Sequence, residues 1–153
     1  MDTLSVQIVS DLHPKYSDLD IPVTTPYIAF LGNVHQVKDN HYLHLELKIF
    51  PFFETYLRRY KVVFLVLGVR ETQYIKYDAA VEQIRAFEAR INEQPGLGKF
   101  VFLDQKIYDI SPDTTVLGFG NTYRSIDDYN AAHESDLAWL NQQVAHMAEH
   151  EPH

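Results

Sequence analysis

The segment from Lys61 to Leu67 constrains the fold most, because every residue after Lys61 is apolar. A strand with this pattern has no polar face to present to water. Such strands are typical of parallel sheets that are covered on both faces. Gly68 ends the run. We therefore expect a buried strand at this position, in a parallel sheet flanked by helices.

Shorter segments rich in β-branched and aromatic residues predict the other strands. They are Leu4–Asp11, Tyr27–Leu31, Phe100–Leu103 and Thr115–Leu117. A further strand at Lys106–Ile110 is expected to pair with one of the last two, and the tight turn Asp104-Gln105 precedes it. Residues 12–26 contain three prolines, which predicts a loop.

Three segments have helical periodicity. Residues 38–60 are expected to be helical, with a kink or a break at Pro51. Residues 77–94 carry an apolar stripe and end at Pro95-Gly96, and a last helix is expected over 129–149. The order of strands and helices predicts an α/β fold in one domain over residues 1–150, followed by a frayed tail at 151–153.

Composition excludes several classes of partner. The formal net charge is −8, with 13 basic and 21 acidic residues, which argues against nucleic acid. The densest basic group, Arg58-Arg59-Tyr60-Lys61, is too short to form a patch. No apolar run approaches the ~20 residues that span a bilayer, so no membrane association is expected. With no cysteine and no visible secretory signal, the expected compartment is the cytoplasm.

Polar residues follow three of the expected strands. The strand ends read Ser10-Asp-Leu-His13, Gly32-Asn-Val-His35 and Gly68-Val-Arg-Glu71. In α/β sheets ligands usually bind at the carboxyl ends of the strands. An Asp and a His two residues apart at such an end can share a metal ion, although a turn with a satisfied histidine has the same pattern. Gly96-Leu-Gly98, by contrast, is a lone G-x-G pair that a turn explains.

Taken together, the three strand ends resemble the first three blocks of the calcineurin-like metallophosphoesterase superfamily. That family has D-x-H, then G-D, then G-N-H-E/D, each after a strand. Small fungal-type members are also similar in the segments Gln7–His13, Val63–Gly68, Tyr108–Pro112, Thr115–Gly118 and Asn130–Leu140. The resemblance covers nearly the whole chain and implies β-sheet layers flanked by helices.

The departures from the family pattern bear on function. The resemblance implies that the residue at position 33 bridges two metal ions, but here it is the neutral Asn33. Val69 stands where the family has a metal-ligating Asn, and Arg70 where it has a His that assists the leaving group. Asp11, His13 and Asn33 remain as candidates for one weak metal site. Two-metal catalysis needs both ions, so we expect no metal cofactor and no two-metal hydrolysis.

The later metal-binding blocks of the family have no counterpart here. The chain has no G-H-x-H, and His146 and His150 at i, i+4 are interpreted as exposed histidines. The family members are longer, so the resemblance implies that the C-terminal part of the fold is missing. A half-sandwich leaves an apolar sheet face open, from which we expect a homodimer or a higher oligomer.

Three functional hypotheses remain. The first is a metal-independent acid/base enzyme for a small organic molecule, such as a cyclase, isomerase or dehydratase. Its expected catalytic residues are Asp11, His13, Arg70 and Glu71, with His13 as general base and Arg70 holding an enolate or carboxylate. The residues expected to contact the ligand are Asn33, His35 and Tyr74. The second hypothesis is a non-catalytic binding or scaffold protein, and the third a residual single-metal phosphoesterase.

Overall fold

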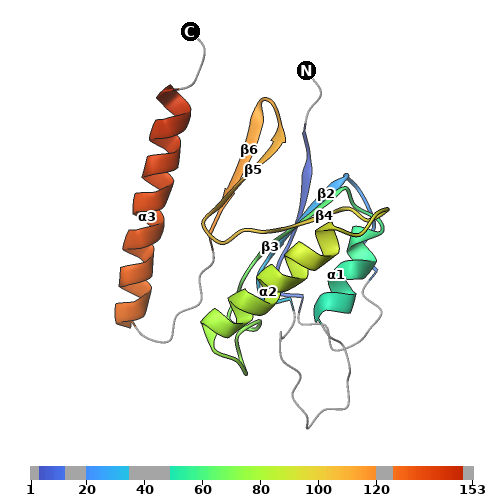
Figure 1. Ribbon diagram of the computed structural model, residues 1–153, viewed down its shortest axis with the longest axis horizontal. Helices are drawn as coiled ribbons and strands as arrows, with labels where there is room; N and C mark the ends of the chain where they lie inside the picture. The colour runs from blue at the N-terminus through green and yellow to red at the C-terminus, as the bar shows by residue number, and fades with distance from the viewer. Residues whose placement is uncertain (1–3, 13–19, 35–48, 120–125, 150–153) are drawn as a thin grey trace.

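The computed structural model describes residues 4–12, 20–34, 49–119 and 126–149. Within these ranges the chain forms six strands and three helices (Figure 1). A parallel sheet lies at the centre, with helices packed over one of its faces. The α/β class predicted from the sequence is confirmed in the described part of the chain.

The central sheet has four parallel strands in the order β1-β2-β3-β4. They are β1 (Val6–Val9), β2 (Tyr27–Leu31), β3 (Val62–Val66) and β4 (Lys99–Phe102). Each lies within one or two residues of its predicted position. Because the strands are parallel and adjacent, the loops that follow β1, β2 and β3 emerge at the same edge of the sheet, and the sequence motifs lie in these loops.

Helices α1 (Ile49–Leu57) and α2 (Tyr77–Asn92) connect β2 to β3 and β3 to β4. Both pack over one face of the sheet (Figure 1). The core between them is aromatic, with Phe30 in edge contact with Phe53 and Tyr56 at ring-centroid distances of 5.5 and 5.1 Å. The α2 stripe predicted from periodicity is fully buried, and consists of Ala80, Ile84, Phe87 and Ile91.

Pro51 does not interrupt the described helix. It is the third residue of α1, and in the first turn a helix loses no internal hydrogen bond to proline. The expected kink is therefore not present within 49–57. The rest of the segment predicted to be helical, residues 38–48, lies outside the described residues.

The second face of the sheet is covered by a hairpin of β5 (Lys106–Ser111) and β6 (Thr114–Gly118). The two strands pair with each other in antiparallel register, with Ser111 opposite Thr114. Lys106–Ile110 thus pairs with the predicted 115–117 strand and not with Phe100–Leu103 across Asp104-Gln105. A turn of only two residues, after Ser111, joins the strands of this hairpin. Tyr108 packs on Phe64 of the sheet at 5.4 Å.

The hairpin leaves part of this second face uncovered. Side chains alternate between the faces of a strand, so Ile8 and Leu31 lie on the same face as Ala29 and Val66. Ile8 is 66% exposed and Leu31 is 47% exposed. The open apolar area therefore lies at the β1 edge of the sheet.

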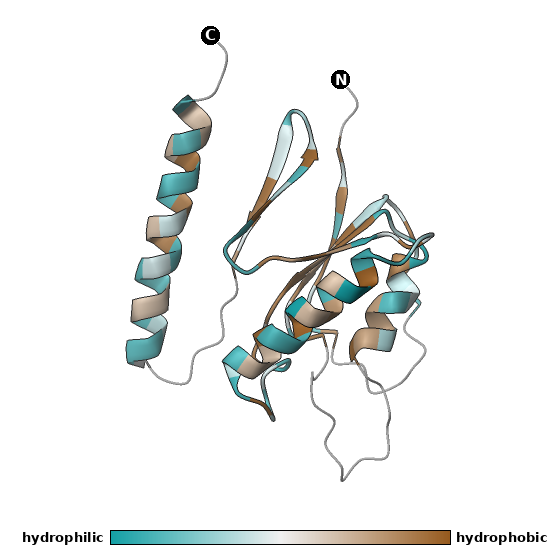
Figure 2. Cartoon of the chain, in the orientation of Figure 1, coloured by the Kyte–Doolittle hydropathy of each residue, from teal (hydrophilic) through white to brown (hydrophobic). Residues whose placement is uncertain are grey.

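Helix α3 (Ile126–Glu149) follows the hairpin and lies beyond it (Figure 1). The Gln105 amide donates to Asp136 at 2.9 Å and to Ser135 at 3.2 Å, and Asp136 is buried. Leu137 and Val144 of this helix are exposed, and Figure 2 shows mixed hydropathy along the whole helix. No helix in the described part of the chain has both the length and the apolar character for crossing a membrane.

The stability of this core is expected to decrease at high pH, because it contains a buried tyrosine hydroxyl. Burial raises the pKa of the Tyr56 hydroxyl above its usual value of 10.0, while Arg59 partly opposes the shift. A group with a raised pKa in the folded state binds its proton more tightly there, so stability is lost as the pH rises through that pKa. We expect the urea midpoint to fall above about pH 10. Tyr56→Phe should reduce the fall, and an unchanged slope in that variant would contradict this account.

Candidate functional site

Three strand ends converge at one edge of the sheet. After β1 the backbone turns at Asp11, which has a φ of 53°, and its N–H donates to the Gly32 carbonyl at 3.3 Å. After β2 the chain turns at Gly32 and Asn33, with φ values of 80° and 55°. Asn and Asp tolerate this left-handed region better than other side chains that carry a Cβ. These turns direct the Asp11 and Asn33 side chains toward each other.

Asn33 connects the first and third loops. Its side-chain N–H donates to Asp11 Oδ1 at 2.8 Å, and its Oδ1 accepts the backbone N–H of Arg70 at 3.1 Å. The second carboxylate oxygen of Asp11 accepts the Ser10 hydroxyl at 2.6 Å. A carboxylate at position 33 could accept from Arg70 but could not donate to Asp11. The amide is therefore the side chain that fits both neighbours.

Glu71 lies beneath this cluster and is fully buried. Its Oε2 accepts the backbone N–H groups of Asn33 at 3.0 Å and Gly68 at 2.7 Å, and its Oε1 accepts that of Val34 at 2.6 Å. Hydrogen bonds to an ionised group are among the strongest in proteins. Glu71 thus joins the loop after β2 to the loop after β3, and in this arrangement it is a positioning residue.

The two loops approach each other through glycines. A Cβ built on Gly68 would lie 2.5 Å from the Asn33 backbone nitrogen and 2.7 Å from its Oδ1. A Cβ on Gly32 would lie 2.7 Å from the Gly68 nitrogen. Both contacts are shorter than real side chains make, and both involve backbone atoms. Only glycine at these two positions lets the backbones come close enough for the hydrogen bonds described above.

Gly68→Ala is therefore expected to separate the two loops and to lower the free energy of unfolding by about 2–3 kcal/mol. Urea unfolding measures the loss. Gly96→Ala is the matched control, because a Cβ there meets nothing within 4 Å and the cost is the strain of its φ of 80°. That strain amounts to about 1 kcal/mol. Equal losses in the two variants would refute the steric account.

The remaining residues predicted for this site fall into two groups. Arg70 is half-buried next to the cluster, and Tyr74, which is 45% exposed, lies in the loop between Glu71 and α2. His13 and His35 lie outside the described residues. The structure therefore brings together Asp11, Asn33, Arg70 and Glu71.

The side chains that the structure describes at this site do not fit the two-metal centre that the family resemblance implies. Asn33 directs an N–H at Asp11, and an N–H donor cannot ligate a cation. Val69 is 65% exposed and offers no ligand atom. Among residues 4–12, 20–34, 49–119 and 126–149, no three His, Cys, Asp or Glu side chains gather into a group that could hold a metal ion.

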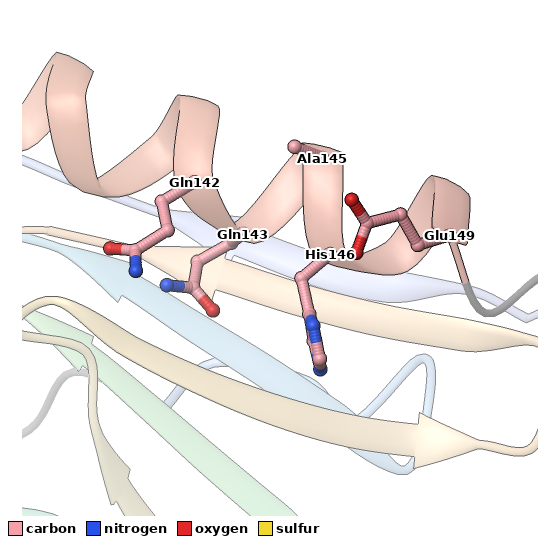
Figure 3. A pocket seen from close by; sticks show the side chains of 5 residues that line it. All are labelled: Gln142, Gln143, Ala145, His146 and Glu149. Atoms are coloured by element: carbon pink, nitrogen blue, oxygen red, sulfur yellow. The ribbon is translucent and has the colours of Figure 1, made fainter.

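A hollow lies beside the C-terminal half of α3, away from this cluster, with a volume of about 480 Å³. Figure 3 shows Gln142, Gln143 and His146 projecting from one side of the helix toward the strands, with Glu149 next to His146. His150, the partner of His146 in the i, i+4 pair, lies outside the described residues. The lining consists of two amides, one alanine, one histidine and one carboxylate, all from α3.

Two features of the site were not predicted from the sequence. The structural role of Glu71 depends on three backbone N–H groups. The positions of backbone groups cannot be inferred from the order of side chains in the sequence. The Ser10 contact with Asp11 is between neighbouring residues, so the Ser-Asp pair after β1 was its signal.

Comparisons with known proteins add no relationship. No protein-family model matches the chain, no curated protein matches it, and no solved structure matches it. The resemblance to metallophosphoesterases therefore stays a prediction from the sequence motifs.

Proposed function

We propose that this protein carries out a metal-independent acid/base reaction on a small organic anion, at the edge of the sheet where Asp11, Asn33 and Arg70 meet. One observation carries the proposal: the Asn33 amide hydrogen-bonds to both the Asp11 carboxylate and the loop of Arg70. A neutral bridge holds the two loops in the position where the family resemblance implies metal ions. The site is thus held together without a cation.

Each residue has a role in this proposal. Arg70 carries a guanidinium group, so its role is to bind a carboxylate or an enolate oxygen rather than to transfer a proton. His13, two residues after Asp11 in the sequence, is the general base of this proposal. Glu71 keeps the two loops together. Proton removal next to a carbonyl and its return at another atom is an isomerisation, and loss of water after proton removal is a dehydration.

The fold belongs to the same proposal. The four-stranded parallel sheet with a hairpin packed on its second face is compatible with the first part of a metallophosphoesterase-like layered fold. The order of the three loops supports this assignment, and each follows the strand that the motif order requires. On this account the chain keeps the family scaffold and has replaced its chemistry.

Deuterium exchange tests for the proposed chemistry. A panel of 2-oxo and 3-oxo carboxylic acids is incubated in D₂O with the protein and a chelator, and proton NMR follows exchange at the carbon next to the carbonyl. We expect exchange above background, reduced at least tenfold in Arg70→Gln and in His13→Ala. Arg58→Gln is the control, because Arg58 lies at the other end of the sheet. Binding of the acids without exchange would favour the non-catalytic binding hypothesis.

We also propose self-association through the open part of the second sheet face. Ile8 and Leu31 are apolar, exposed and on the same face, and β1 is an edge strand of the sheet. Exposed apolar surface next to an open edge is typical of interaction sites. A second copy covers both by pairing this face with its own.

Light scattering at micromolar concentration tests the association. We expect a dimer or a higher oligomer for the wild-type chain and a monomer for Ile8→Lys, because the lysine places a charge in the apolar contact. Ile107→Lys is the matched control, since Ile107 is 39% exposed on the hairpin. A wild-type monomer, or dissociation in both variants, would overturn the proposed interface.

A further inference from the structure

A group of basic side chains gathers at the amino ends of β3 and β4, at the edge of the sheet opposite the candidate site. There a hollow of about 510 Å³ is lined by Arg58, Arg59, Lys61 and Lys99, together with residues 96–98. We call it the basic hollow. None of its described lining residues is Asp or Glu. The three-residue cluster seen in the sequence becomes a patch because the fold adds Lys99 from β4.

Backbone hydrogen bonds join the segments that carry these basic residues. The N–H of Lys99 donates to the Lys61 carbonyl at 2.8 Å, and the N–H of Gly98 donates to the Leu57 carbonyl at 2.7 Å. A Cβ on Gly98 would lie 1.9 Å from the Tyr60 carbonyl oxygen, so only glycine permits this approach. Gly98 therefore lets the loop before β4 dock onto the end of α1.

Most of these charges have no internal partner. Arg59 pairs with Asp20 at 2.6 Å and donates to the Ile21 carbonyl. No ion pair joins Arg58, Lys61 or Lys99 to another described residue. They are not needed as helix caps either, because the last carbonyls of α1 accept backbone donors: Tyr56 from Arg59 and Tyr60, and Leu57 from Gly98. In a chain of net charge −8, Arg58, Lys61 and Lys99 thus lie close together without an ion pair to another described residue.

We propose that the basic hollow binds a compact, multiply charged oligophosphate anion. Several cations around one hollow raise the local concentration of anions, and a ligand with several charges close together gains most from them. Guanidinium groups add paired hydrogen bonds to phosphate oxygens, and ammonium groups act as point charges. A singly charged carboxylate gains less. The site is separate from the acid/base site, and its test does not depend on the proposed function.

Isothermal titration at low salt, with inorganic tripolyphosphate as the probe, tests this inference on the full chain. We expect saturable binding that weakens with added salt. The double variant Lys61→Gln/Lys99→Gln should weaken it at least tenfold. The matched control, Lys76→Gln/Arg90→Gln, removes the same charge from α2 and the residue before it, and should stay within twofold of wild type.

Two further titrations, with ATP and with a polyglutamate peptide, identify the class of ligand. ATP binding as tight as tripolyphosphate binding supports recognition of the phosphates alone, and tighter binding supports a nucleotide as their source. Absence of tripolyphosphate binding, or an equal loss in the control variant, would overturn the site. Tighter binding of a polyglutamate peptide would overturn the ligand class in favour of an acidic polypeptide. All four substituted side chains are exposed or half-buried, and circular dichroism confirms that each variant is folded.

Discussion

Glu71→Ala is expected to lower the free energy of unfolding by about 4 kcal/mol, because it leaves three backbone N–H groups without their acceptor. The Glu71 side chain is fully buried, so water cannot replace it without opening the loops. Domains of this size have a total stability of about 5–15 kcal/mol. Urea unfolding should therefore show a variant that is folded only at low urea concentrations.

Two comparisons separate the role of Glu71 from a general effect of losing a carboxylate. Glu71→Gln keeps one acceptor oxygen but loses the charge, and we expect about half of the loss. Glu82→Ala removes an exposed carboxylate from α2 and should change stability by less than about 0.5 kcal/mol. Similar values for Glu71→Ala and Glu82→Ala would mean that Glu71 does not hold the loops together.

Asn33→Asp is expected to destabilise the protein by about 2 kcal/mol at neutral pH. The substitution replaces a donor that lies 2.8 Å from Asp11 Oδ1 with a second carboxylate. Like charges at this distance favour a form in which the two groups share a proton. That proton binds more tightly in the folded protein, so the lost stability should return as the pH falls and disappear again as it rises. Urea unfolding as a function of pH measures this.

A divalent cation is a second means of restoring the stability of the Asn33→Asp variant. Two carboxylates facing each other attract a cation such as Mn²⁺, whereas the Asp-Asn pair does not need one. We therefore expect Mn²⁺ to raise the stability of Asn33→Asp and to leave the wild type unchanged. Asn141→Asp, on the exposed side of α3, should respond to neither pH nor Mn²⁺ in this way. An Asn33→Asp variant as stable as wild type without metal would contradict the bridging role of the amide.

Much of the fold could be predicted because the apolar residues that a helix or strand buries follow a regular pattern along the sequence. The apolar run of β3 indicates a strand buried on both faces. The apolar stripe of α2 indicates which side of that helix is buried, and consists of Ala80, Ile84, Phe87 and Ile91. The pairing of β5 could not be predicted in the same way, since Lys106–Ile110 alternates equally well beside either candidate neighbour. In the structure, a two-residue turn between Ser111 and Thr114 pairs it with β6.

The site was only partly predictable. Motif order placed Asp11, Asn33 and Arg70 at the ends of consecutive strands, and a parallel sheet brings those ends together. What the motifs could not reveal is how the groups connect, because an Asn at a metal position is equally compatible with a weak ligand and with a hydrogen-bond bridge. The deciding contacts run to backbone N–H groups of Arg70, Gly68 and Val34. The basic hollow was missed because Lys99 lies far from Lys61 in sequence.

The central claim is that this site works without the two metal ions of the enzymes it resembles. Hydrolysis of an aryl phosphate and of an aryl phosphodiester, measured with added Mn²⁺ or Ni²⁺ and again with a chelator, tests it most directly. We predict no turnover above that of Asp11→Ala under either condition. Turnover that rises with Mn²⁺ or Ni²⁺ and vanishes in Asp11→Ala would contradict the account.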